Sequence, residues 1–160
     1  MTLVTEADGY HLDAGEGEAL WFAGGLLTHK ATGDQTDGQL MVAEVVGPRG
    51  TGSPLHLHER EDEAWYVLDG ELTSWIGDRK LTASTGSFVF GPREVPHRFR
   101  VESVEARFLD LMTPAGFEHF TRSSGWPTEV RALPPEDLAP RDDADLDAIA
   151  RVHGLRIQPG

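Results

Sequence analysis

The sequence predicts an all-β domain built from antiparallel strands, and three observations support this prediction. The chain has 160 residues, a length that suits one domain with one hydrophobic core. Its 18 glycines and 10 prolines are spread along the chain, which indicates frequent turns and few long helices. Short apolar segments recur at even spacing, with connections too short for crossover helices. A parallel α/β sheet is therefore excluded, and a β-sandwich or β-barrel is expected.

The predicted strands lie between residues 19 and 112. We expect the apolar segment 19–28 to pair with 39–46 as an opening hairpin, with a polar turn at 33–38. Further short strands, separated by Gly, Asp or Pro, are predicted at 55–58, 63–70, 71–78, 80–84, 87–90, 96–101 and 105–112. The region 19–112 is therefore interpreted as the β-domain.

The two ends of the chain differ from this central region. Residues 1–18 are rich in Asp, Glu and Gly and are predicted to form a flexible arm. After residue 112, Thr113 is a plausible N-cap for a helix that ends at Gly125, and a second helix is expected over 142–153. Residues 113–160 are thus predicted to be a helical extension packed on the β-domain.

The charge balance excludes several classes of partner. Fourteen Lys and Arg oppose 27 Asp and Glu, giving a net charge of −13, so we expect neither nucleic-acid nor membrane binding. The chain has no cysteine, so any metal must be held by His and carboxylate groups. Neither a signal peptide nor an apolar run near the ~20 residues of a membrane span is evident, and a cytoplasmic location is expected.

A cluster of metal-ligand residue types lies in the predicted strands. His56 and His58 are two residues apart, so a β-strand presents both imidazoles to one face. Glu63 follows, and His97 alternates with arginines on its strand, so that it points to the interior. Buried imidazole and carboxylate groups are costly without partners. A divalent cation would satisfy these four side chains together.

A purely structural role for these residues is the alternative, since the chain has seven histidines and an isolated His-x-His pair arises easily by composition. The step from His58 to Glu63 is odd, so a regular strand would place them on opposite faces. A turn or bulge over residues 59–62 is therefore required, and its four charged residues are interpreted as an exposed connection.

The spacing around this cluster resembles the first motif of the cupin superfamily, at Gly50, His56, His58, Glu63 and Gly70. Gly86, Pro92 and His97 resemble the second motif, and the likeness covers about residues 20–112. Glu94 stands where the second motif usually has glycine, and Val101 where it usually has asparagine. Neither departure affects a ligand position.

The resemblance implies a cupin-type antiparallel jelly-roll β-barrel with short C-terminal helices. It also implies one divalent transition metal ion per chain, held by the matching residues His56, His58, Glu63 and His97. Mixed imidazole and carboxylate ligation suits Ni, Fe, Mn, Co, Cu or Zn, and the sequence does not distinguish among them.

Apolar and aromatic residues of the predicted interior are candidates for a substrate pocket, although most such residues are plain core. The candidates are Met41, Trp65, Phe99, Phe108, Phe117 and Phe120. No inward cluster of Arg or Lys is evident to pair an anionic ligand. The pocket is therefore expected to take a flat, largely apolar, oxygen-bearing molecule.

The flanking segments are similar to the single-barrel quercetin 2,3-dioxygenase-like group of cupins, notably at 20–39, 61–71, 90–97 and 113–120. This resemblance implies oxygenolytic ring cleavage of a flavonol or similar enolisable phenol, with a small aromatic substrate and O2 as partners. Glu63 would accept the hydroxyl proton, helped by a pKa that burial raises.

Two other functions remain open, because one fold hosts many reactions. One is a non-oxygenase cupin enzyme, such as a cyclase or isomerase acting on an aromatic polyketide-like substrate. The other is a metal-containing protein that binds a small molecule without turnover. A homodimer is possible by analogy with other barrels, with 19–28 as a candidate edge strand.

The remaining histidines are interpreted as surface or helix-face residues outside the site, namely His11, His29, His119 and His153.

Overall fold

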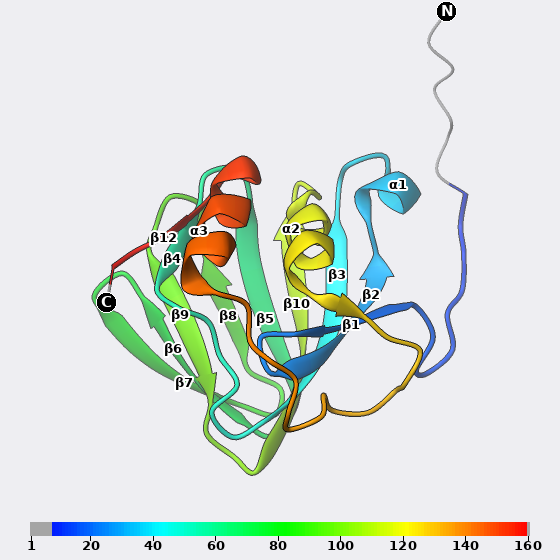
Figure 1. Ribbon diagram of the computed structural model, residues 1–160, viewed down its shortest axis with the longest axis horizontal. Coiled ribbons are helices and arrows are strands. Elements are labelled where there is room, and N and C mark those ends of the chain that lie inside the picture. The colour runs from blue at the N-terminus through cyan, green and yellow to red at the C-terminus, as the bar shows by residue number, and fades with distance from the viewer. Residues whose placement is uncertain (1–7, 160) are drawn as a thin grey trace, which may run out of the picture.

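The computed structural model describes residues 8–159, which form two antiparallel sheets that face each other (Figure 1). The seven-stranded sheet has the order β11 (Trp126–Pro127), β1 (Glu18–Phe22), β2 (Gly25–Ala31), β3 (Met41–Pro48), β10 (Glu105–Thr113), β5 (Asp62–Asp69) and β8 (Phe88–Gly91). The five-stranded sheet has the order β12 (Leu155–Ile157), β4 (His56–His58), β9 (His97–Val101), β6 (Glu71–Ile76) and β7 (Arg79–Ser84). The predicted all-β, jelly-roll type of fold with short C-terminal helices is confirmed.

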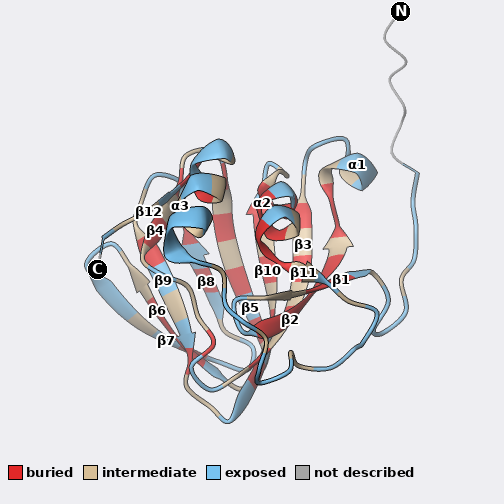
Figure 2. Ribbon diagram, viewed as in Figure 1, coloured by how far each residue is buried: buried red, intermediate tan, exposed pale blue. Residues whose placement is uncertain are grey.

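The hydrophobic core lies between the two sheets, where Figure 2 shows the buried positions alternating along the strands. On β3 the burial pattern alternates strictly between buried and partly buried residues, as expected for a strand with one face toward the core. The largest fully buried apolar side chains are Trp65, Phe108, Leu20, Leu27, Met41, Leu72 and Met112. This packing fixes the faces of the strands that carry the candidate site.

The segment 19–28 is not one strand, so the predicted pairing with 39–46 is confirmed for its second half and wrong for its first half. It contains both β1 and β2, which pair with each other through a tight turn at Ala23 and Gly24. Both turn residues have positive φ, 53° and 84°, as a type I′ hairpin requires. A continuous apolar run concealed this turn, and it is β2 that pairs with β3.

Three helices are present in the described part of the chain: α1 (Gly33–Thr36), α2 (Phe117–Ser124) and α3 (Asp143–Val152). The predicted start of α2 at Thr113 is wrong, because Thr113 ends β10 and Gly116 is the N-cap. Its capping carboxylate comes from Glu118, which accepts bonds from the Gly116 and Gly33 N–H groups, both at 2.7 Å. The predicted start of α3 is confirmed: Asp142 caps it by accepting a bond from the Ala144 N–H. None of the described helices is long and apolar enough to span a membrane.

The C-terminal region contributes strands as well as helices, which the sequence did not predict. β11 pairs with β1 along Leu20 and Trp21, and β12 pairs with β4 along its whole length. Segment 19–28 therefore does not offer a free edge through β1, contrary to the expectation for a dimer contact. In Figure 1, β12 lies beside β4 and α3 packs next to β12. The helices α2 and α3 also lie next to each other.

The predicted N-terminal arm lies partly outside the described residues, at positions 1–7. Residues 8–17 form no strand, but side chains connect this segment to the barrel. The Tyr10 hydroxyl donates to the Lys30 carbonyl, and the Lys30 ammonium donates to the Glu16 carbonyl, both at 2.6 Å. The Arg131 guanidinium donates to the Gly17 carbonyl, also at 2.6 Å.

Candidate metal centre

Three imidazoles converge because two neighbouring strands present them to the same interior face. On β4 the burial pattern is buried, partly buried, buried, so His56 and His58 both point inward as their spacing predicted. The register of β4 against β9 places His56 directly opposite His97. Their ring centroids are 4.5 Å apart, and His58 and His97 are each 1% exposed.

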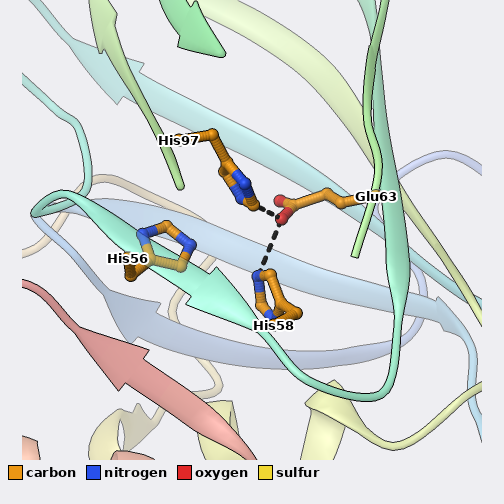
Figure 3. A group of neighbouring side chains, drawn as sticks. All are labelled: His56, His58, Glu63 and His97. Atoms are coloured by element: carbon orange, nitrogen blue, oxygen red, sulfur yellow. Dashed lines mark hydrogen bonds and ion pairs between the residues drawn. The ribbon is translucent and has the colours of Figure 1, made fainter. Parts of the chain in front are cut away.

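The carboxylate reaches the imidazoles from the facing sheet (Figure 3). The chain leaves β4 after His58, turns, and enters β5 at Asp62, which provides the predicted turn. Glu63 Oε2 lies 2.9 Å from His58 Nε2 and 3.0 Å from His97 Nε2. One ligand atom from each of the four residues lies within 4.8 Å of the others, so the set could hold a single ion.

The outer nitrogens of the imidazoles face oxygen acceptors, which fits metal ligation through the inner nitrogens. His56 Nδ1 lies 2.7 Å from the Pro54 carbonyl, and His97 Nδ1 lies 3.0 Å from the Val95 carbonyl. A hydrogen on each Nδ1 leaves Nε2 with a free lone pair, the usual arrangement of metal-binding histidines. His58 Nε2 lies close to Glu63 but has no hydrogen-bond partner of acceptable geometry in the described chain. These donors fit a divalent cation.

Burial and mutual charge separate the pKa values within the cluster. Burial, helped by the charges of His97 and His58, lowers the pKa of His56 to about 3. Burial also acts to lower the pKa of His58, but the Glu63 and Glu61 carboxylates outweigh it and raise that pKa to about 9. Burial acts to raise the pKa of Glu63, but the charges and hydrogen bonds of His58 and His97 hold it well below its usual range. The expectation of a raised Glu63 pKa was therefore wrong.

A cavity of about 620 Å³ opens onto this cluster, with His56 and Glu63 in its wall. Of the predicted pocket residues, Phe99, Phe108, Phe117 and Phe120 line the cavity. Met41 and Trp65 are fully buried and are not among its lining residues. The loop between β11 and α3 supplies much of the remaining wall, through residues 134–136 and 138–141.

Two buried carboxyl groups near the cluster were missed by the sequence analysis. Glu61 was interpreted as part of an exposed charged run, but it is only 4% exposed and its Oε2 lies 3.6 Å from His58 Nδ1. Asp110 is 6% exposed and lines the cavity. Burial raises the pKa of Asp110 well above its usual range, and the charge of Glu63 and a hydrogen bond with Glu63 raise it further. The sequence did offer a signal for Asp110, because its carboxyl group falls among the alternating inward and otherwise apolar positions of β10.

The structure accommodates both residues that depart from the second cupin motif, Glu94 and Val101. Glu94 adopts φ 65°, the left-handed conformation that glycine favours. Its backbone N–H donates to the His58 carbonyl at 2.7 Å, so the turn next to the site keeps its connection to β4. Val101 is fully buried in the core, and its backbone N–H donates to the Thr51 carbonyl.

Of the four other histidines, three lie where the sequence placed them. His11 and His119 are exposed, and His153 is partly exposed at the end of α3. His29 was misassigned, because it is 3% exposed on β2. Its Nδ1 lies 2.7 Å from Glu18 Oε1, and its Nε2 lies 3.0 Å from the Thr121 hydroxyl.

Comparison with known proteins identifies the same region. Residues 42–112 match the family model of the cupin domain. Over 140 residues, or 88% of the chain, the sequence is 33% identical to quercetin 2,3-dioxygenase from Bacillus subtilis. A second curated relative, the uncharacterized protein MJ1618 from Methanocaldococcus jannaschii, is 28% identical over 57 residues, or 36% of the chain. The chain spans less than half of the length of either relative, 42% and 46%.

Solved structures show the same fold at low sequence identity. KdgF from Halomonas sp. has a TM-score of 0.59 and 21% identity, covering 67% of this chain and 94% of its own. A predicted oxalate decarboxylase from Thermotoga maritima has a TM-score of 0.55 and 20% identity, covering 61% of this chain and 92% of its own. The chain therefore belongs to the cupin superfamily and is related in sequence to the quercetin 2,3-dioxygenase group.

Proposed function

We propose that the protein is a metal-dependent dioxygenase of the quercetinase type, which opens a ring of a flavonol or a similar enolisable phenol. One observation carries this proposal: a cluster of three imidazoles and one carboxylate adjoins an apolar cavity of about 620 Å³, whose wall includes two of its members, His56 and Glu63. This volume is within the range of small-molecule sites, roughly 300–1,000 Å³. The sequence identity to a quercetin 2,3-dioxygenase supports the choice of reaction.

The residues that would hold the metal are His56, His58, Glu63 and His97. Their burial removes competing water, and the acceptors on the outer imidazole nitrogens orient the rings. A divalent transition metal ion would act there as a Lewis acid that lowers the pKa of a ligand hydroxyl and would bring the redox chemistry that O2 requires.

Glu63 is proposed to accept the proton of the substrate hydroxyl. The charges and hydrogen bonds of His58 and His97 hold its pKa low, which keeps the carboxylate ionised but makes it a weak base. Proton transfer to Glu63 would therefore require that the bound metal ion also lower the pKa of the substrate hydroxyl. Glu63 also belongs to the cavity wall, where a bound phenol would meet it. General-base catalysis by a positioned carboxylate contributes typically about 10²–10⁴-fold to a rate.

The aromatic wall is proposed to orient a flat ring system and exclude water from it. Phe117 and Phe120 stack with centroids 5.5 Å apart, and Phe22 meets both rings edge-on at 6.3 and 5.9 Å. Phe99 meets Phe108 edge-on at 5.3 Å. Such rings offer faces and edges to a planar aromatic ligand.

Oxygen uptake by the metal-loaded protein in the presence of quercetin and related flavonols tests the proposal. The Glu63→Gln variant should lose about 10²-fold or more of the rate if the carboxylate accepts the proton. Glu71→Gln, at an exposed position of β6, is the matched control and should keep the rate. Elemental analysis of each variant separates loss of the base from loss of the metal.

Two results would replace this proposal. Turnover of an aromatic substrate that continues without oxygen would indicate a cyclase or isomerase that uses the same residues. Tight binding of flavonols with no turnover, under any of the metals tried, would indicate a binding protein.

A further inference from the structure

We propose that Asp110 is a ligand-binding residue of the cavity, whose carboxyl group forms a hydrogen bond with a hydroxyl group of the ligand. The ligand would then carry a second hydroxyl group, in addition to the one directed at the metal-binding residues. This inference rests on the proposed function for the ligand class, polyhydroxylated aromatic molecules, but it concerns binding and not the reaction with O2.

The sheet register places Asp110 near the metal-binding carboxylate. On β10 the inward residues Phe108, Asp110 and Met112 are all buried. β10 pairs with β5 so that Asp110 is opposite Trp65 and Met112 is opposite Glu63. Residues diagonal to each other on one face of a sheet lie within reach of a side chain. Asp110 and Glu63 therefore lie close together, and both residues line the cavity.

The carboxyl group of Asp110 is buried with incomplete hydrogen bonding. Asp110 is 6% exposed, and its Oδ1 has no hydrogen-bond partner among residues 8–159. Burying a polar group without a partner costs roughly 1–3 kcal/mol, so an apolar residue would suit the empty protein better. A ligand hydroxyl in the cavity would supply the partner that the protein does not.

Thr51 is the one other cavity-wall residue in the described chain whose buried side-chain oxygen, Oγ1, lacks a hydrogen-bond partner. Unlike Asp110, it follows β3 in a loop and does not lie beside Glu63 in the sheet. Ser74 Oγ and Trp65 Nε1 are also buried without partners in the described chain, but neither residue lines the cavity. Glu136 and Asp143 line the cavity but are exposed at its outer side. Asp110 thus combines burial, an oxygen without a partner and a place in the cavity wall beside Glu63.

The test measures binding under nitrogen, with the metal-loaded protein and without turnover. The probes are 3-hydroxyflavone and derivatives that carry one additional ring hydroxyl, and their dissociation constants are measured by calorimetry. We expect wild-type protein to bind at least one derivative about tenfold more tightly than 3-hydroxyflavone, the size of one satisfied buried hydrogen bond. In Asp110→Leu this preference should fall to less than about twofold.

Three controls accompany this measurement. Asp110→Asn retains hydrogen-bonding atoms and should recover part of the preference. Ser74→Ala removes a buried hydroxyl that is not in the cavity wall and should leave the preference unchanged. If Asp110→Leu does not fold, Asp110→Ala is measured in its place. Elemental analysis checks that each variant binds the same amount of metal as the wild type.

The outcomes separate this inference from the proposed function. A hydroxyl preference that persists in Asp110→Leu or Asp110→Ala would overturn the inference. So would an equal loss of affinity for all probes, which would mean that Asp110 only positions Glu63. Selective binding that depends on Asp110, without any oxygen uptake, would support the inference while overturning the dioxygenase proposal.

Discussion

At the scale of single residues, the candidate site consists of polar groups placed in an apolar interior. His56, His58 and His97 are each less than a tenth exposed, and each has its outer nitrogen near an oxygen acceptor. This arrangement directs the inner nitrogens toward Glu63. Because burying these groups is costly without a common partner, the cluster is best explained as a metal centre.

Replacing one imidazole should therefore remove the metal. We expect His56→Ala and His97→Ala each to lose most of the bound divalent ion, because the variants lack one of the four donors and the geometry of the site is incomplete. Elemental analysis of protein purified with added metal measures this. His119→Ala, at an exposed position of α2, is the control, and unchanged metal in the His56 and His97 variants would contradict the assignment.

His29 should make the folding stability depend on pH. Burial lowers the pKa of His29 below its ordinary value of 6.5, so the unfolded chain binds a proton more readily than the folded protein. The resulting stabilisation is present above pH 6.5 and is lost as the pH falls through the lower, folded-state value.

Urea denaturation between pH 7.5 and 5 measures the free energy of unfolding of the wild type and of two histidine variants. The comparison of their pH dependence checks this expectation. His29→Gln cannot titrate and should show a weaker fall in unfolding free energy than wild type. His11→Gln, at an exposed position, should follow wild type. An identical pH slope in wild type and His29→Gln would refute the role of this residue.

At the scale of elements, the C-terminal segment is part of the barrel and of the cavity wall. β12 pairs with β4 so that Leu155 is opposite His58 and Ile157 is opposite His56. Leu155 is 4% exposed, belongs to the core and lines the cavity. β12 thus supports the strand that carries two of the four candidate metal ligands.

Truncating Leu155 should measure this support. Leu155→Ala is expected to lower the free energy of unfolding by about 2–4 kcal/mol, because a buried leucine leaves a cavity when it is shortened. Val152→Ala, at a residue of α3 that is 72% exposed, should change stability by less than about 0.5 kcal/mol. Chemical denaturation of both variants gives the comparison, and equal stabilities would show that β12 contributes little to the barrel.

At the scale of the whole molecule, the two sheets assemble a site that neither sheet contains alone. His56, His58 and His97 come from the five-stranded sheet, whereas Glu63 and Asp110 come from the seven-stranded sheet. The loop between β11 and α3 then covers the cavity beside them. The proposed chemistry therefore requires the closed barrel, and not one strand or motif.

The sequence predicted the strand-rich fold, the inward pair on β4 and the spacing of the candidate metal ligands, because alternation along a strand and turn residues are local properties. It missed the hairpin turn at Ala23 and Gly24, the pairing of β12 with β4, and the buried positions of Glu61, Asp110 and His29. Each of these depends on contacts between segments far apart in the chain. The folded structure was needed to establish them, because burial and strand partners follow from how the sheets pack and not from neighbours in sequence.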